Sequence, residues 1–165
     1  MLSRRTFVAS AVLASLGALG VYEGMLPDAG VGFAVLGGDE PLIVAAVADA
    51  FFPPGNPVGV AARDIDLAAR VDLLLADALE PQIVLAFRYV LRALEDGTRL
   101  SRGTRFSRLD LDTRREVVNV WGDDAVVPRR MALDALKIVL ALAWFNEPEV
   151  AAALGWTPSC HLGTT

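Results

Sequence analysis

Apolar residues recur at intervals of three and four along most of the chain beyond residue 38. This spacing places them on one face of an α-helix. No segment alternates apolar and polar residues over several positions, which is the pattern of a half-buried strand. The sequence therefore predicts an all-α fold, a single compact helical domain of about six helices.

Helix-capping residues and prolines predict where these helices begin and end. Asp39 and Pro41 open the first helix, and the Pro53-Pro54-Gly55 run stops it. The remaining expected starts and ends are Asp64 or Asp66 and Ala78 for the second, Pro81 and Gly97 for the third, Asp110 or Asp112 and Gly122 for the fourth, Pro128 and Phe145 for the fifth, and Asn146 and Gly155 for the sixth.

Two stretches carry further expectations. The fifth helix is apolar almost all round, which predicts a central buried helix. Residues 98–109 are expected to form a basic loop that carries Arg99, Arg102, Arg105 and Arg108. These arginines are compatible with a solvated loop, with an anion site and with contacts to an acidic partner.

The N-terminus has the layout of an export signal. The segment Ser3-Arg4-Arg5-Thr6-Phe7-Val8 places two arginines before an uncharged run over residues 7–22. This order resembles the twin-arginine signal, which carries already folded proteins out of the cytoplasm. Cleavage after Gly20 and retention as a membrane anchor both stay open. We expect a signal segment at 1–22, a Gly/Pro linker at 23–38 and a helical domain at 39–165.

Composition and charge narrow the classes of partner. The net charge of −5 argues against nucleic acid, and hydrophobic residues reach 54% against 21% charged ones. This surplus predicts that some apolar surface is meant for a partner. Trp144 is expected in the core, whereas Trp156 lies beyond the last helix between prolines and is a candidate interface anchor.

No catalytic or metal-binding motif is complete. Cys160 and His161 are the only cysteine and histidine, and adjacent residues in an extended tail point apart. The Asp110-x-Asp112 pair lacks the later positions of a calcium loop. Helix starts explain these aspartates, Asp64-x-Asp66 and Asp123-Asp124. The glycines at 30–38 lack the third glycine or the lysine of nucleotide-binding loops.

The order of motifs resembles a known family. It comprises the twin-arginine signal, the Phe51-Phe52-Pro53-Pro54-Gly55 end of the first helix, Phe106-x-x-Leu109 before a helix with Arg114, and the later runs Trp144-Phe145-Asn146-Glu147-Pro148 and Leu154-Gly155-Trp156-Thr157-Pro158. Together they are similar to the gluconate 2-dehydrogenase subunit 3 family, the small subunits of bacterial flavin-dependent sugar and polyol dehydrogenases.

The resemblance implies a non-catalytic, chaperone-like small subunit that folds with a large FAD-dependent (GMC-type) dehydrogenase subunit. The twin-arginine translocase would carry both chains to the periplasm or the outer face of the cytoplasmic membrane. FAD, and haem or an iron-sulfur centre, would be held by partner subunits, a cytochrome c subunit among them, and none by this chain.

The resemblance also implies roles for individual residues. Arg4, Arg5 and Phe7 would be read by the export machinery. Pro53, Pro54, Trp156 and Pro158 would contribute to the partner interface, and Cys160 would form an intersubunit disulfide. No catalytic or metal-binding residue is expected.

Two other readings compete with the subunit role. A free-standing periplasmic helical protein would hold an apolar ligand between its helices and would be a stable monomer. A small enzyme using acidic residues at helix starts is disfavoured by the incomplete motifs.

Overall fold

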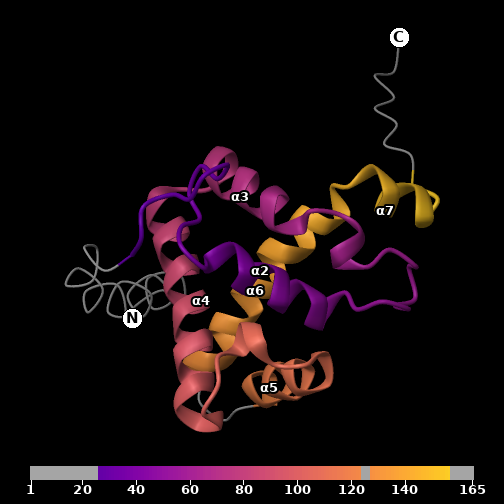
Figure 1. The fold of residues 1–165 in the computed structure, drawn as a ribbon. Coiled ribbons are helices and arrows are strands. Elements are labelled where there is room, and N and C mark those ends of the chain that lie inside the picture. Colours follow the sequence, from indigo (N-terminus) through magenta and orange to yellow (C-terminus); the bar gives the residue numbers. More distant parts are fainter. Residues whose placement is uncertain (1–25, 124–126, 157–165) are drawn as a thin grey trace, which may run out of the picture.

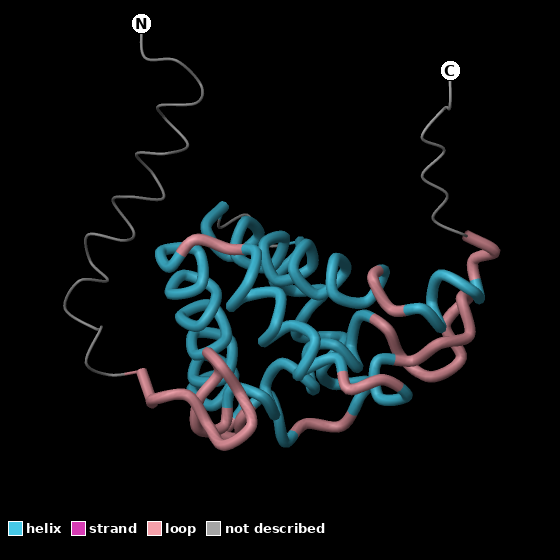
Figure 2. The backbone as a smooth tube through the Cα atoms, turned by 90° about the horizontal axis from the view of Figure 1, so that it is seen from above, coloured by secondary structure: helices cyan, strands magenta, loops and turns pink. Residues whose placement is uncertain are grey.

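The computed structural model describes residues 26–123 and 127–156 of the 165. These residues form the α-helices α2 (Glu40–Phe51), α3 (Leu67–Ala78), α4 (Pro81–Arg102), α5 (Leu111–Asp123), α6 (Val127–Phe145) and α7 (Pro148–Ala153), with 3₁₀ turns η2 (Ala62–Asp64) and η3 (Phe106–Arg108) (Figure 1). The described chain contains helices and loops without a strand (Figure 2). The predicted all-α fold is confirmed.

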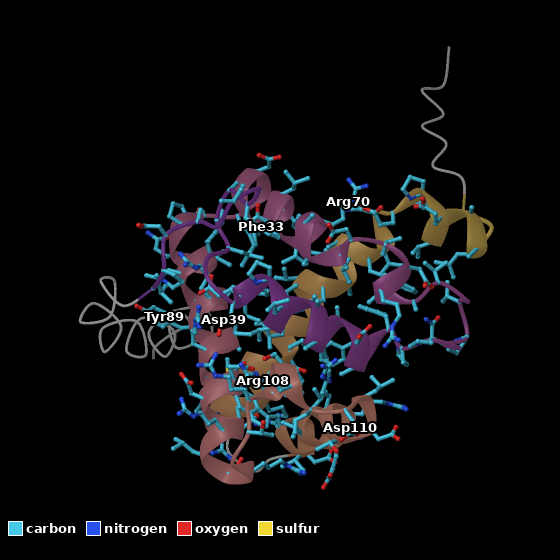
Figure 3. All side chains as sticks on the ribbon, viewed as in Figure 1. Phe33, Asp39, Arg70, Tyr89, Arg108 and Asp110 are labelled. Atoms are coloured by element: carbon cyan, nitrogen blue, oxygen red, sulfur yellow. The ribbon has the colours of Figure 1, made fainter. Side chains whose placement is uncertain are left out.

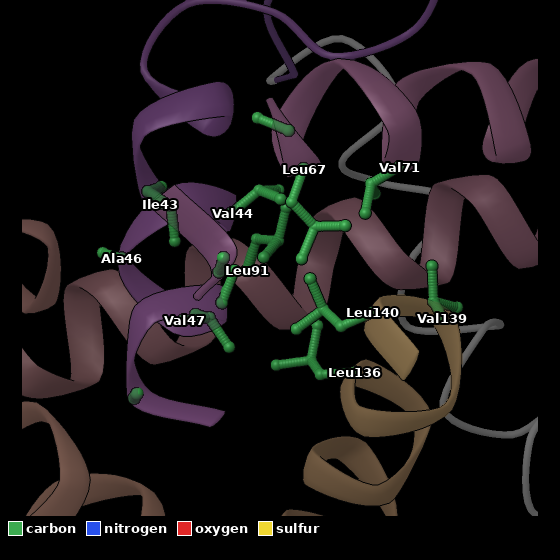
Figure 4. Packing of buried hydrophobic residues seen from close by; sticks show 14 of the residues in the cluster. Ile43, Val44, Ala46, Val47, Leu67, Val71, Leu91, Leu136, Val139 and Leu140 are labelled. Atoms are coloured by element: carbon green, nitrogen blue, oxygen red, sulfur yellow. The ribbon is translucent and has the colours of Figure 1, made fainter. Parts of the chain in front are cut away.

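Two apolar helices form the centre of the domain. Helix α2 contacts α3, α4, α5 and both 3₁₀ turns, while α6 contacts α3, α4, α5 and α7. Their buried side chains meet in one cluster, in which Leu136 and Leu140 of α6 lie near Val47 of α2 and Leu91 of α4 (Figure 4). One contiguous core therefore supports all the described helices.

Local signals fix several helix starts as the sequence predicts. The Asp66 carboxylate accepts a hydrogen bond from the Ala69 amide at 3.3 Å, so Asp66 caps α3. Asp110 accepts one from the Thr113 amide at 2.9 Å and caps α5. This bond, together with that from the Thr113 hydroxyl, lowers the pKa of Asp110 below its usual value.

Asp39 stands at the start of α2 but its side chain makes no capping bond. Asp39 lies beside α4 (Figure 3), where it pairs with Arg92 of that helix and, at 2.8 Å, with Arg105. Asp39 is the N-cap residue of α2, as predicted, and its carbonyl accepts the amide of Ile43 at 3.1 Å. Its carboxylate makes no capping bond because it is bound by two guanidinium groups.

Helix α4 runs past the expected end at Gly97. It continues to Arg102, and Gly103 forms the C-cap with φ 76°, its amide bonded to the Arg99 carbonyl at 2.9 Å. Thr98 is buried and its hydroxyl donates to the Leu94 carbonyl at 2.7 Å. The predicted loop over 98–109 is therefore helical in its first half, because tertiary burial outweighs the helix-breaking tendency of one glycine.

The start of α7 also differs from the prediction. Asn146 does not cap it; Glu147 occupies that position, and its buried carboxylate forms an ion pair with Arg70 of α3 at 2.9 Å. Pro148 is the first helical residue, as its fixed φ favours. The pair ties the C-terminal helix back to α3.

Residues 26–38, which belong to the segment expected to be a linker, pack against the helices. Leu36 is fully buried in the core, and Ala29 and Gly37 form an isolated bridge. The Asp72 carboxylate of α3 accepts the amides of Ala34, Val35 and Leu36 at 2.6, 2.9 and 2.7 Å. The packed body of the protein thus includes residues ahead of Asp39.

Candidate interaction surface

Helix α6 buries only part of its surface, which corrects the prediction of a central buried helix. Leu133, Leu136 and Leu140 are buried in the core. The opposite side is open, with exposed fractions of 45% for Met131, 61% for Ile138, 50% for Leu142 and 48% for Phe145. Ala135 is exposed as well. We call the exposed set Met131, Ala135, Ile138, Leu142 and Phe145 the α6 seam.

The α6 seam continues into a small pocket at the C-terminal end of the helix. This pocket has a volume of about 260 Å³ and is lined by Phe145, Asn146, Ala151, Leu154 and Trp156. Leu154 and Trp156 are about half exposed, the latter at 57%. Phe145 belongs to both features, so one apolar surface runs along α6 and around its end.

An aromatic stack holds this end of the molecule in place. The rings of Phe52 and Trp144 are stacked at 4.4 Å, and Phe145 meets Trp144 edge-on at 5.0 Å. Trp144 is buried, as predicted for a core residue. The stack packs the end of α2 against the end of α6. The edge-on contact with Trp144 also orients the Phe145 ring, since edge-on aromatic pairs are favourable.

The other expected interface residues lie at the same end. Pro53 is half-buried and Pro54 exposed in the loop after α2. The side-chain amide of Asn56 donates to the carbonyls of Pro53 and Val60 at 2.9 and 2.8 Å and thereby braces this loop. Both views place the loop and α7 at one end of the domain (Figures 1 and 2). Whether Pro53, Pro54 and Trp156 touch a partner stays a prediction.

Several predicted functional residues lie outside the described part of the chain. These are Arg4, Arg5 and Phe7 of the export signal, and Pro158 and Cys160 of the tail. Trp156, the last described residue, has its amide bonded to the Ala151 carbonyl at 2.9 Å.

The basic stretch forms a second, polar hollow. Arg99, Arg105 and Arg108 line a pocket of about 280 Å³ with Gly103 and Thr104. Arg105 already pairs with Asp39, and Arg102 pairs with Glu116 at 3.1 Å. Two of the four arginines, Arg102 and Arg105, thus hold elements together. The helix dipole also favours Arg99 and Arg102 in the last turn of α4.

The buried carboxylates have structural partners. Glu40 is fully buried, accepts the Gly37 amide at 2.9 Å and pairs with Arg88 at 2.8 Å. Glu95 accepts the amide and hydroxyl of Ser107 at 2.9 and 2.6 Å. Each of them, like Asp72, sits on a helix and holds a non-helical segment. The bonds of Glu40, Glu95 and Asp72 go to backbone amides, guanidinium groups and the Ser107 hydroxyl, so these three carboxylates serve to hold the fold together.

Within residues 26–123 and 127–156, no group of three or more metal-ligating side chains converges. In the same residues, no helix is both long enough and apolar enough to cross a bilayer. The described structure leaves apolar side chains uncovered along α6 and around its C-terminal end, and surfaces of this kind mark interaction sites. The fold and surface define an all-α domain with a candidate interaction surface.

The family follows from comparison with known sequences. The sequence model of gluconate 2-dehydrogenase subunit 3 matches residues 39–159, so the chain belongs to this family, whose members are small subunits of a dehydrogenase complex. Searches of curated proteins and of solved structures gave no match. The predicted resemblance is confirmed, and membership implies association with other gluconate dehydrogenase subunits.

The α6 seam is the part of this surface that sequence reasoning missed. The signal was present, because Met131, Ala135, Ile138, Leu142 and Phe145 follow the alternating four-and-three spacing of a helix seam. Leucines and a tryptophan on the other side of the same helix hid it. Apolar composition alone does not distinguish a face covered by its own domain from one left open.

Proposed function

We propose that this chain is the non-catalytic small subunit of a periplasmic FAD-dependent sugar or alcohol dehydrogenase, and that it carries the flavoprotein through the twin-arginine pathway. The observation that carries the proposal is the match to the subunit family over residues 39–159 in a chain that begins with a twin-arginine segment. The large subunit provides FAD and the substrate site, and a cytochrome c subunit, or an iron-sulfur centre, accepts its electrons.

The structure supports this role in two ways. The buried carboxylates Glu40, Asp72 and Glu95 are engaged in holding the fold. Of the thirteen large apolar residues that are exposed in the described chain, seven lie on α6 or just beyond its end. Burial of such a surface against a second chain is favourable by roughly 25 cal/mol for each Å² removed from water. A small subunit of this design would bind its partner before export, because the twin-arginine route accepts folded cargo.

The tail carries the proposed covalent link. Cys160 lies four residues beyond Trp156, close in sequence to the apolar pocket. In the oxidising periplasm a single cysteine favours a disulfide with another chain. Non-reducing electrophoresis of the isolated complex measures it: the two chains should run as one band that dithiothreitol separates, and two separate bands before reduction would remove the disulfide from the proposal.

Affinity isolation of the tagged full-length chain from its native host tests the subunit role. We expect a yellow complex with flavin absorbance, one associated dehydrogenase chain, and dye-linked oxidation of sugars or alcohols. Recovery of a colourless, well-folded protein alone would contradict the proposal and would support the free-standing ligand-binding alternative.

A further inference from the structure

The exposed residues of α6 form a regular pattern. Successive members of the α6 seam, Met131, Ala135, Ile138, Leu142 and Phe145, are separated by four, three, four and three positions. This is the a/d spacing with which one helix packs against another over a long contact. The helix has 19 residues and is therefore about 28 Å long. A pattern that persists over its length is more specific than scattered exposed apolar residues.

The surroundings of the seam also suit a protein partner. The seam carries no charge, while Asp134 and Lys137 lie at its side, with 3.9 Å between the carboxylate and the ammonium group. An apolar centre with charged residues at the rim is the usual anatomy of an interface. Because the opposite side of α6, with Leu133, Leu136 and Leu140, is buried in the core against α3, α4 and α5, the helix cannot turn to hide the seam.

We propose that the α6 seam packs against a helix of the large dehydrogenase subunit, with the partner also covering the pocket of Phe145, Leu154 and Trp156. This inference rests on the proposed function and specifies which face performs it. The partner helix would present its own apolar a/d residues to Ile138 and Leu142, crossing α6 at about 20°.

The small area of the α6 seam and the continuation of the apolar surface beyond it favour the large subunit over a second copy of this chain. A strip about 22 Å long, the length of residues 131–145 in a helix, and about 10 Å wide provides roughly 220 Å², well below the roughly 800 Å² per partner of a stable interface. The occupant must therefore extend beyond the helix. The apolar surface continues past Phe145 to Trp156, where residues 157–165 with Cys160 follow. A single large partner that covers both the α6 seam and this pocket would meet the requirement.

A matched pair of substitutions tests the seam. Ile138→Lys places a charge in its centre, and Asp134 four residues earlier supports the new lysine on the helix. Leu100→Lys is the control, because Leu100 is 89% exposed on α4 and Asp96 also lies four residues earlier. Each tagged full-length variant is isolated from the native host, and the flavin recovered per small subunit is measured.

We expect Ile138→Lys to reduce the recovered flavin at least tenfold, while Leu100→Lys stays within twofold of the wild type. Circular dichroism of the variants should show unchanged helix content. If the Ile138→Lys variant recovers as much flavin as the wild type does, the proposed contact along the α6 seam is wrong, although the subunit role stands. If the wild type brings none, the subunit role itself fails, and the inference fails with it.

A photo-cross-linking residue at position 138 gives a second readout that does not depend on the stability of a variant complex. The adduct should contain the flavoprotein chain by mass spectrometry, and position 100 should give none. An adduct with another copy of this chain would overturn the inference in favour of a homodimer. Cosedimentation of the isolated chain with phosphatidylethanolamine–phosphatidylglycerol vesicles, lost in Ile138→Lys, would overturn it in favour of a membrane surface.

Discussion

Buried carboxylates act as anchors for the segments between helices. Asp72 accepts three consecutive amides of the N-terminal segment, Glu95 holds Ser107 of η3, and Glu40 holds Gly37 and Arg88. A charged acceptor strengthens such bonds, and an unmet buried amide is costly. These three acidic residues therefore maintain the fold.

Replacement of Asp72 by alanine should destabilise the protein by about 3 kcal/mol, because three amides lose a charged acceptor. Asp72→Asn keeps one acceptor oxygen and should cost about half as much. Urea unfolding gives the free energies, and hydrogen exchange at residues 34–36 should accelerate more than exchange within α6. A loss below about 1 kcal/mol in Asp72→Ala would contradict the anchoring role.

At the scale of elements, local sequence signals and tertiary burial have opposite effects on where α4 ends. The proline at position 81 starts the helix as expected, but the glycine at position 97 does not end it. The helix continues to Gly103, which has a positive φ, because Thr98 and the turn that contains Phe106 are buried near the end of α4. The true C-cap is set by contacts that no single window of sequence contains.

Gly97→Ala should stabilise the protein by about 1 kcal/mol, because glycine is a poor residue inside a helix. The added Cβ would meet only the Trp121 ring, at 4.0 Å. Gly103→Ala is the opposing case and should cost about 1–2 kcal/mol, since φ there is positive. Thermal unfolding of both variants checks the two signs. Destabilisation by Gly97→Ala would mean that α4 ends near residue 97 after all.

Prolines and capping aspartates predicted most helix starts, because those signals act within one turn of chain. Pro41, Asp66, Pro81 and Asp110 lie where a helix begins. Such local signals do not predict contacts between residues that lie far apart in the sequence. Asp72 reaches residues 36 to 38 positions away, and the burial of one side of α6 depends on α3, α4 and α5. The helical fold was thus predictable, and the α6 seam was not.

At the scale of the whole molecule, the protein combines a rigid helical body with an apolar surface that its own helices leave open. The family to which it belongs supplies small subunits to a dehydrogenase complex. In the proposed function, the helical body would bind the flavoprotein in the cytoplasm, and Arg4 and Arg5 would direct both chains to export. Export and assembly are then properties of one chain.

Cell fractionation of the Arg4→Lys, Arg5→Lys double variant tests this central claim most directly. The change keeps both positive charges and leaves the helical body unaltered. We predict that dye-linked dehydrogenase activity and the flavoprotein chain move together from the periplasmic fraction to the cytoplasm, with the complex still intact. A flavoprotein that reaches the periplasm in full amount in the double variant would contradict the account.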